Sequence, residues 1–185
     1  GEEGVRAINI SEDKLTIDKV VLAAGVWSRK LAKELGSHVP LEAERGYHIM
    51  FNGTDMKLKS AIMSVDRYIS ITPMLQGIRA GGMAEFASID TKANMNNAKI
   101  IKHHAQSLFP NLYSNNISEW MGPRPSHPDS KPVIDRSPLH NNLFFAFGHD
   151  HIGFTLGGIT GKVISELITG KKTTLDLNPF KVDRF

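Results

Sequence analysis

The chain of 185 residues is 41% hydrophobic and 22% charged with a formal net charge of +3, a composition typical of a globular protein with one large domain or two small lobes. Its basic residues are scattered and the longest run is Lys171-Lys172, which argues against nucleic-acid binding. The absence of cysteine excludes disulfide bonds, thiolate metal sites and cysteine nucleophiles.

The first forty residues alternate short strands with one helix. A hairpin is predicted over Val5–Ile10 and Lys14–Ile17. The apolar run 20–25 predicts a strand that is buried on both faces. A helix is expected next, with Ser28 as its N-cap and Gly36 just past its end.

From Glu42 to Phe86 the pattern changes to consecutive strands, which are predicted over 45–51, 60–65, 68–74 and 78–86. In the third of these strands, Ile69 and Ile71 are expected to share one face. The opposite face, with Tyr68, could line a pocket or simply meet water.

The second half contains two predicted helices, Asn97–Phe109 before Pro110 and a closing helix over 154–169. Short strands are expected at 118–121, 133–134 and 142–147. The closing helix contains three glycines, each of which costs about 1 kcal/mol relative to alanine. We therefore expect another group to approach the first turns of this helix closely. The glycines are Gly157, Gly158 and Gly161.

Arg124 is flanked by Pro123 and Pro125 in a predicted loop. The following proline restricts Arg124 to extended backbone, so its guanidinium is presented in a fixed direction. A guanidinium held in this way can bind a carboxylate through two hydrogen bonds. The alternative is a structural arginine paired with Asp129 or another acid.

A glycine-rich turn, Gly148–Gly158, connects a strand to the closing helix. Helix N-termini offer unpaired N–H groups and partial positive charge, so this turn could bind a phosphate or the edge of a flavin, or it could bind nothing. His149 and His151 could provide two metal ligands, but no third ligand follows at a recognisable spacing. We therefore expect no metal site, and interpret one histidine as a hydrogen-bonding group.

Five stretches together resemble the FAD-dependent amine and D-amino-acid oxidoreductases, the group of D-amino-acid oxidase, glycine oxidase and sarcosine oxidase. They occur in the order that the family has and extend over most of the chain. The likeness is greatest to bacterial D-amino-acid dehydrogenases, including those that act on D-proline or hydroxy-D-proline. The stretches are residues 20–28, 44–48, 67–74, 120–134 and 147–155.

The resemblance implies an α+β or α/β fold: a substrate-binding lobe with an antiparallel-rich mixed sheet, joined to the remnant of a Rossmann-like FAD-binding lobe. Residues 1–40 would belong to the FAD-binding lobe and residues 41–121 to the substrate-binding lobe. Residues 122–185 would return to the FAD-binding lobe with the flavin-edge turn and the C-terminal helix.

The resemblance also implies the residues of the site, although it assigns no catalytic side chain. Arg124 would bind the substrate carboxylate, and Tyr47, His48 and Tyr68 would shape the substrate side. Backbone N–H groups of the glycine-rich turn would face the flavin edge, where negative charge accumulates on reduction. The implied FAD-binding residues are Gly25, Val26, Trp27, Gly148, His149, Asp150, His151, Ile152, Gly153, Phe154 and Thr155.

Three departures from the family are visible. The family usually has glycine at the positions of Asp135 and Asp150. An anion beside a flavin edge is unfavourable unless it points away from that edge. The Gly-x-Gly-x-x-Gly unit that binds the FAD pyrophosphate has no match, and the chain starts without an initiator methionine. We therefore expect a C-terminal fragment that does not bind FAD tightly alone.

The expected function is oxidation of the CH–NH bond of a D-amino acid to an imino acid, with hydride transfer to FAD. The acceptor that takes the electrons from the reduced flavin stays open between a quinone and oxygen. The alternatives are a sarcosine or dimethylglycine-type amine oxidoreductase and a non-catalytic module that retains the fold.

A homo-oligomer is one expectation for the fragment, because a missing strand would expose a sheet edge. No signal peptide or membrane span is recognisable. We expect a cytoplasmic protein, with peripheral attachment to the inner membrane as the alternative.

Overall fold

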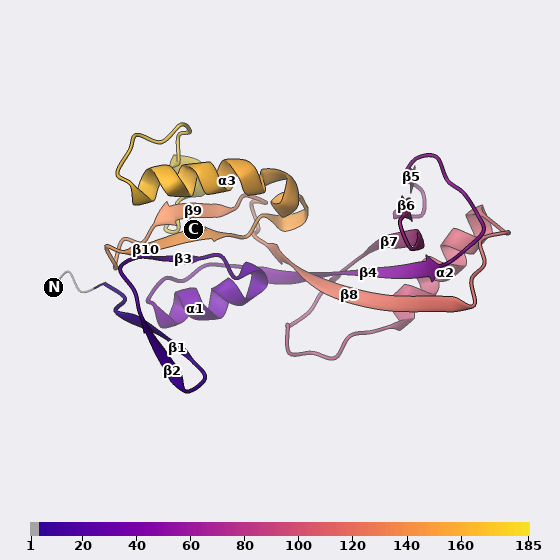
Figure 1. The fold of residues 1–185 in the computed structure, drawn as a ribbon, viewed down its shortest axis with the longest axis horizontal. Helices are drawn as coiled ribbons and strands as arrows, with labels where there is room; N and C mark the ends of the chain where they lie inside the picture. Colours follow the sequence, from indigo (N-terminus) through magenta and orange to yellow (C-terminus); the bar gives the residue numbers. More distant parts are fainter. Residues whose placement is uncertain (1–3) are drawn as a thin grey trace. The chain divides into compact units, whose positions relative to one another are not determined.

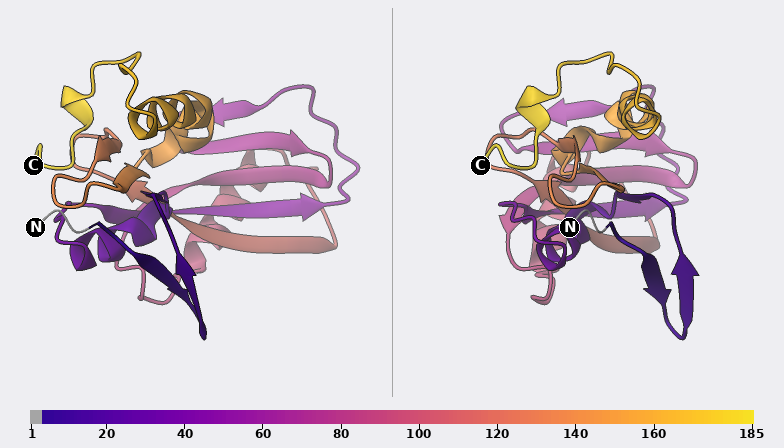
Figure 2. Two further views of the ribbon diagram at one scale, coloured as in Figure 1. Left: turned by 60° about the vertical axis from the view of Figure 1, so that its left-hand side comes forward. Right: turned by 90° about the vertical axis from the view of Figure 1, so that its left-hand side faces the viewer.

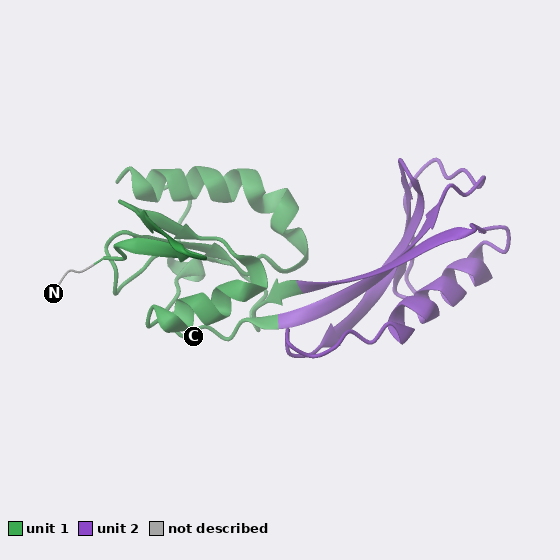
Figure 3. Ribbon diagram, turned by 60° about the horizontal axis from the view of Figure 1, so that its bottom comes forward, with its two compact units in different colours: residues 1–42, 124–185 green, residues 43–123 purple. Residues whose placement is uncertain are grey.

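The computed structural model describes residues 4–185 and contains two compact units (Figure 3). Unit 1 combines the chain up to residue 42 with residues 124–185, and unit 2 consists of residues 43–123. The boundaries fall inside two long strands, β4 (Glu42–Asn52) and β8 (Asn116–Ser126). Residues 1–3 of the segment predicted for 1–40 lie outside the described residues. The assignment of one unit to FAD and the other to substrate stays a prediction.

Unit 1 contains a three-stranded sheet in the order β3-β10-β9, formed by β3 (Val20–Leu22), β10 (Leu143–Phe147) and β9 (Val133–Arg136). Strand β10 is parallel to β3 and antiparallel to β9. The predicted hairpin is confirmed as β1 (Ala7–Ile10) and β2 (Asp13–Thr16), which form a separate antiparallel pair that projects from this unit (Figure 2).

Helices cover both faces of the unit 1 sheet, α1 (Ser28–Glu34) on one side and α3 (Gly153–Ile168) on the other (Figure 1). The side chains of β10 alternate between these faces, as strand geometry requires. Phe144 packs with Val163 of α3, whereas Phe145 packs with Ala32 of α1. The sheet thus separates two buried clusters, and the one on the α1 side combines residues 22–41 with residues 133–182.

Two predictions for the start of unit 1 are wrong. Strand β3 is not buried on both faces, since Val21 is 37% exposed and β3 is an edge strand of the sheet. Ser28 is not the N-cap of α1, because the 3-10 helix η1 (Gly25–Trp27) runs directly into that helix. The Ser28 hydroxyl instead accepts a hydrogen bond from Ala24 N–H at 3.0 Å. Gly36 has φ +83° just past α1, as predicted.

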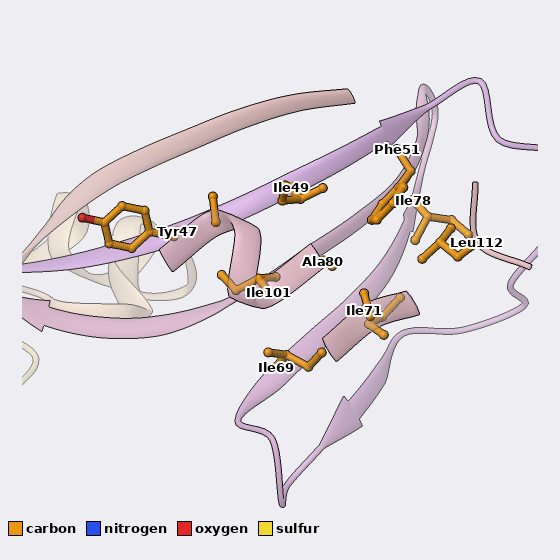
Figure 4. Packing of buried hydrophobic residues seen from close by; sticks show 11 residues of the cluster. Tyr47, Ile49, Phe51, Ile69, Ile71, Ile78, Ala80, Ile101 and Leu112 are labelled. Atoms are coloured by element: carbon orange, nitrogen blue, oxygen red, sulfur yellow. The ribbon is translucent and has the colours of Figure 1, made fainter. Parts of the chain in front are cut away.

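Unit 2 is a five-stranded sheet in the order β5-β6-β7-β4-β8, which adds β5 (Ile62–Ser64), β6 (Ile69–Met74) and β7 (Gly77–Phe86). The predicted helix is confirmed as α2 (Asn96–Leu108), which packs on one face of the sheet (Figure 4). The buried core consists of Tyr47, Ile49, Phe51, Ile69, Ile71, Ile78, Ala80, Ala98, Ile101, Ala105 and Leu112.

Two predictions for unit 2 and its boundary are also wrong. Tyr68 does not belong to β6: it lies in the preceding turn with φ +51° and is 80% exposed. Strand β8 is longer than predicted and extends through Arg124, which therefore lies in a strand rather than a loop. β8 is an edge strand, where prolines are tolerated because alternate N–H groups point away from the sheet.

The segment after α3 includes the 3-10 helix η3 (Asn178–Phe180) and is fastened to β9. The Asp135 carboxylate accepts hydrogen bonds from the N–H groups of Arg136 at 2.8 Å and Val182 at 3.0 Å. Burial raises the pKa of this carboxyl group.

Across residues 4–185, none of the helices has the length and apolar character needed to cross a lipid bilayer. The predicted α+β class with antiparallel-rich sheets is confirmed.

Candidate functional site

The parallel pair in unit 1 brings two predicted FAD-binding segments to one edge of the sheet. Strands β3 and β10 are neighbours in parallel register, so their carboxyl ends lie side by side. Each strand is followed by a glycine with positive φ: Gly148 at +80° comes directly after β10, and Gly25 at +56° comes three residues after the end of β3. Each then enters a 3-10 helix, η1 or η2 (Asp150–Ile152). Ligands of open α/β sheets bind at such carboxyl ends, and we call this edge the strand-end site.

The strand-end site exposes apolar side chains beside the first turn of α3, which no side chain caps. Trp27 is 60% exposed, Ile152 50% and Phe154 fully exposed. Neither η2 nor α3 has a side-chain hydrogen bond at its N-cap. The first turn of α3 can therefore donate to a negatively polarised group. Val26 is buried in the core, so it can offer such a ligand only its backbone.

His127, which the sequence analysis did not select, packs beneath the glycine turn. A Cβ atom at Gly148 would overlap the imidazole of His127, so this position requires glycine for space as well as for its φ. His127 is 4% exposed and stacks on Phe185 at 5.2 Å between ring centroids. Burial and the nearby Arg184 guanidinium lower its pKa to about 4. His127 is therefore neutral near pH 7.

His149 and His151 occupy different surroundings within the turn. Nε2 of His149 lies 3.0 Å from the hydroxyl of Thr160 on α3, and burial lowers the pKa of His149. Nε2 of His151 lies 3.3 Å from the Asp150 carboxylate, and its side chain is 53% exposed. His149 thus ties the turn to the helix, whereas His151 faces solvent.

Asp150 occupies a position that glycine favours, because its φ is +52°. Asp and Asn tolerate this left-handed conformation better than most residues. The Asp150 carboxylate accepts a hydrogen bond at 2.8 Å from the hydroxyl of Ser126 at the end of β8. That hydrogen bond fixes the orientation of the Asp150 carboxylate, which the sequence alone did not determine.

Arg124 is half-buried near the end of β8. Asp129, the partner considered for a purely structural arginine, is held instead by Arg184. The two distances between the Arg184 guanidinium and the Asp129 carboxylate oxygens are 2.9 Å and 3.1 Å. These bonds, with the Arg184 charge, lower the pKa of Asp129.

The three residues predicted to shape the substrate side are not brought together within unit 2. Tyr47 is 1% exposed in the core, where its hydroxyl donates to Glu85 and accepts from the N–H of Asn94. Tyr68 lies in the exposed turn before β6. His48 points to the face of the sheet opposite α2, where it stacks on Trp120.

The glycines of α3 have no close neighbour among residues 4–185. Cβ atoms built on Gly157, Gly158 and Gly161 would find no heavy atom within 4 Å, apart from the local backbone of the helix. All three residues are exposed. The described part of the chain therefore does not supply the close approach that the sequence led us to expect.

The chain is similar to FAD-dependent enzymes over nearly its whole length. It is 34% identical to a D-amino-acid oxidase of Bradyrhizobium diazoefficiens over 183 residues, 97% of this chain and 44% of the relative. It is 30% identical to a D-amino acid dehydrogenase of Rhizobium rhizogenes, over 98% of this chain and 44% of the relative. The chain thus spans less than half the length of these curated relatives.

Solved structures show the same fold. Glycine oxidase from Geobacillus kaustophilus has a TM-score of 0.86 at 22% identity and covers 97% of this chain and 49% of its own. L-proline dehydrogenase from P. horikoshii has a TM-score of 0.80 at 21% identity, over 98% of this chain and 50% of its own. The family model described as DAO, FAD dependent oxidoreductase, matches residues 1–167. The chain therefore belongs to the DAO family of FAD-dependent oxidoreductases.

Proposed function

We propose that this chain is the carboxyl-terminal part of an enzyme that oxidises the CH–NH bond of a D-amino acid to an imino acid. The observation that carries the proposal is the strand-end site, where two glycine turns follow neighbouring parallel strands. Family membership and the D-amino-acid names of two relatives support it. FAD, when bound, would accept the hydride that leaves the substrate carbon.

The strand-end site fits one side of a flavin. Trp27, Ile152 and Phe154 expose apolar surface of the kind that an isoalloxazine ring can cover. The uncapped first turn of α3 can donate N–H groups to an edge that gains negative charge. Ser126 holds the Asp150 carboxylate by a hydrogen bond, which limits the repulsion that a freely moving anion would cause.

Arg124 is the residue proposed to bind the substrate carboxylate. Its neighbours Pro123 and Pro125 stiffen the backbone of β8, and its guanidinium can form two parallel hydrogen bonds to a carboxylate. Binding in this way orients the substrate without a protein acid or base. Reactions that depend on a bound cofactor rely mainly on such alignment.

The experiment that tests this function is kinetic and uses the longest natural protein that contains this chain. The substrate panel should include both enantiomers of neutral amino acids and N-methylated glycines, each with oxygen and with a quinone as electron acceptor. We expect turnover of D-amino acids. Turnover of N-methylated glycines alone would favour the sarcosine-type alternative, and a colourless protein would favour a non-catalytic module.

Arg124→Lys tests the proposed carboxylate contact. Lysine keeps the charge but loses the planar fork, so we expect KM to rise roughly ten- to a hundredfold while FAD content is unchanged. Arg29→Lys is the control, because Arg29 pairs with Glu42 on the surface of α1 and its side chain is 52% exposed. An unchanged KM in Arg124→Lys would contradict the assignment.

The 185-residue chain alone provides a second test. The sequence lacks the Gly-x-Gly-x-x-Gly unit that binds the FAD pyrophosphate, so we expect no tight FAD binding. Equilibrium dialysis against FAD measures this directly. If the chain alone retains one yellow flavin per molecule at micromolar concentration, it binds FAD tightly without the Gly-x-Gly-x-x-Gly unit. That result would contradict the expectation that the strand-end site supplies only part of the FAD-binding surface.

A further inference from the structure

Unit 1 contains a cavity whose lining shares no residue with the strand-end site. It is formed by α1, the segment that follows α1 and the last residue of the chain, all within unit 1 (Figure 3). Its volume is about 400 Å³, within the range of about 300–1,000 Å³ that small-molecule sites have. We call it the α1 cavity. It is lined by Arg29, Lys33, His38, Val39, Pro40 and Phe185.

Three of the lining side chains carry a positive charge or can acquire one. Arg29 and Lys33 are four residues apart on α1, so they lie on the same side of that helix. His38 follows shortly after the helix ends, and all three residues are exposed. No acidic residue is among the six that line the cavity. The polar part of the α1 cavity is therefore cationic.

These cations keep donors that the described chain does not use. Among residues 4–185, neither Lys33 nor His38 has a hydrogen bond or an ion pair. Arg29 donates from one terminal nitrogen to the Glu42 carboxylate at 2.6 Å, and its other nitrogens have no partner within that range. Donors of three residues are thus available to a ligand in one cavity.

The rest of the lining is apolar and is held in place by neighbouring groups. Phe185 stacks on His127 at 5.2 Å between ring centroids, and the Arg184 guanidinium lies 4.2 Å from the centre of the Phe185 ring. Asp129 fixes Arg184 through two hydrogen bonds. Val39 is buried in the core of unit 1. A ligand would meet a wall that is already ordered, which lowers the entropy cost of binding.

We propose that the α1 cavity binds a small phosphate ester, with its phosphate on Arg29, Lys33 and His38 and its carbon body against Phe185. A phosphate monoester carries a charge of about −1.5 to −2 near pH 7 and has three terminal oxygens. Each oxygen can accept a hydrogen bond from a different side chain, so three separate donors suit a phosphate better than a carboxylate with two oxygens. The cavity volume leaves room for the ester group beside Phe185.

Glu42 is the acidic group that opposes binding, because it pairs with Arg29. Both side chains are about half exposed, at 52% for Arg29 and 55% for Glu42, so solvent screens this pair. Lys33 then supplies the charge that no described residue compensates. His38 can donate an N–H group in either protonation state. Binding should therefore depend most on Lys33, and the loss of Glu42 should strengthen it.

Isothermal titration calorimetry with phenyl phosphate tests this site in the longest natural protein that contains this chain, with its FAD bound. We expect one phenyl phosphate per chain, bound more tightly than inorganic phosphate, and no binding of phenol. In Lys33→Gln, the affinity for phenyl phosphate falls roughly ten- to a hundredfold, the loss expected for one charge-assisted hydrogen bond. Circular dichroism and thermal unfolding show whether the variant is folded.

Lys30→Gln is the matched control, because Lys30 is an exposed lysine of the same helix that does not line the cavity. We expect its affinity for phenyl phosphate to equal that of the wild type. Glu42→Gln is the second variant, because it removes the acid that competes for Arg29. Since exposed ion pairs contribute little, we expect its affinity to rise only about two- to fivefold. Opposite signs for Lys33→Gln and Glu42→Gln would support the site.

The outcomes bear on this site and not on the proposed function, since none of the lining residues is assigned to substrate or flavin. No binding of phenyl phosphate at millimolar concentration would overturn the inference. Equal affinity in the wild type and Lys33→Gln would also overturn it, because the phosphate would then bind elsewhere. A loss in Lys30→Gln as large as in Lys33→Gln would indicate a general effect of surface charge, with the same consequence.

Discussion

The two units place their candidate site residues in different ways. In unit 2, His48 lies on the sheet face opposite α2 because strand alternation puts it there. In unit 1, the candidate residues lie beyond the ends of β3 and β10, at turns that begin with glycines of positive φ. A site on a sheet face therefore depends on hydrophobic pattern, whereas a site at strand ends depends on single backbone conformations.

The largest predicted effect on stability comes from truncating a buried side chain in the core of each unit, and it tests whether the two units have separate cores. Phe51 in unit 2 and Phe145 in unit 1 are both fully buried. We expect Phe51→Ala and Phe145→Ala each to lower the free energy of unfolding by about 3–5 kcal/mol, through lost burial and the cavity left behind. Hydrogen exchange should show faster amide exchange in unit 2 for the first variant and in unit 1 for the second.

These two variants serve as controls for each other, because the same residue type is truncated at equal burial. If each variant speeds exchange equally in both units, the chain unfolds as one cooperative body. That result would contradict the treatment of the units as separate cores.

The regular parts of unit 2 could be predicted from the sequence. Ile69 and Ile71 are buried because they alternate with polar residues along a strand, and α2 starts within one residue of its predicted position. Tyr68 was misplaced because its aromatic side chain favours a strand, whereas the chain reverses there with φ +51°. Strand β8 was predicted too short, because prolines usually end a strand and their tolerance at a sheet edge depends on the neighbouring strands.

The next largest predicted effect is the contribution of His127 to the pH dependence of the free energy of unfolding. Burial and Arg184 lower its pKa from 6.5 to about 4, and His149 acts in the same direction. Asp129 and the Pro40 carbonyl oppose this shift. The unfolded chain binds the proton near pH 6.5, whereas the folded chain resists protonation until about pH 4. Stability is therefore complete above pH 6.5 and falls by at most roughly 3 kcal/mol as the pH drops toward 4.

His127→Phe isolates this contribution. Phenylalanine keeps a ring that can stack on Phe185 but cannot bind a proton. Asp135, whose pKa is raised, is present in both proteins, and the causes of its shift do not include His127, so the difference between wild type and variant cancels its contribution. That difference retains the electrostatic interaction between His127 and His149. Denaturant unfolding at pH 7, 6, 5 and 4 measures that difference. A constant difference across this range would show that His127 titrates normally in the folded state.

The strand-end site shows where prediction from sequence ends. Its glycine turns and the helix that follows were predicted, because glycine and apolar periodicity are local signals. The packing of His127 beneath Gly148 was not predicted, since the two positions are far apart in sequence and neither belongs to a periodic segment. The hydrogen bond from Ser126 to Asp150 was missed for the same reason. Such contacts depend on how distant segments meet, which no local pattern records.

The smallest predicted effect is the change in stability when a glycine of unit 1 is replaced by alanine. The two glycines compared are Gly25 in the strand-end turn and Gly157 in α3. Neither has a heavy atom within 4 Å of its Cβ position apart from the local backbone, so backbone conformation alone decides the outcome. Gly25 has φ +56°, where alanine is strained, so Gly25→Ala should destabilise by about 1–2 kcal/mol. Gly157 is helical and exposed, so Gly157→Ala should stabilise by about 0.5–1 kcal/mol.

Thermal unfolding of the 185-residue chain measures both changes, and the opposite signs are the diagnostic result. A destabilising Gly157→Ala would mean that a group packs against this surface of α3 in solution, for example in a second copy of the chain, and a concentration series would reveal it. The same variant in a longer protein asks a different question. If alanine stabilises the short chain but weakens FAD retention in the longer protein, the glycine surface is kept free for a close approach that residues 4–185 do not make.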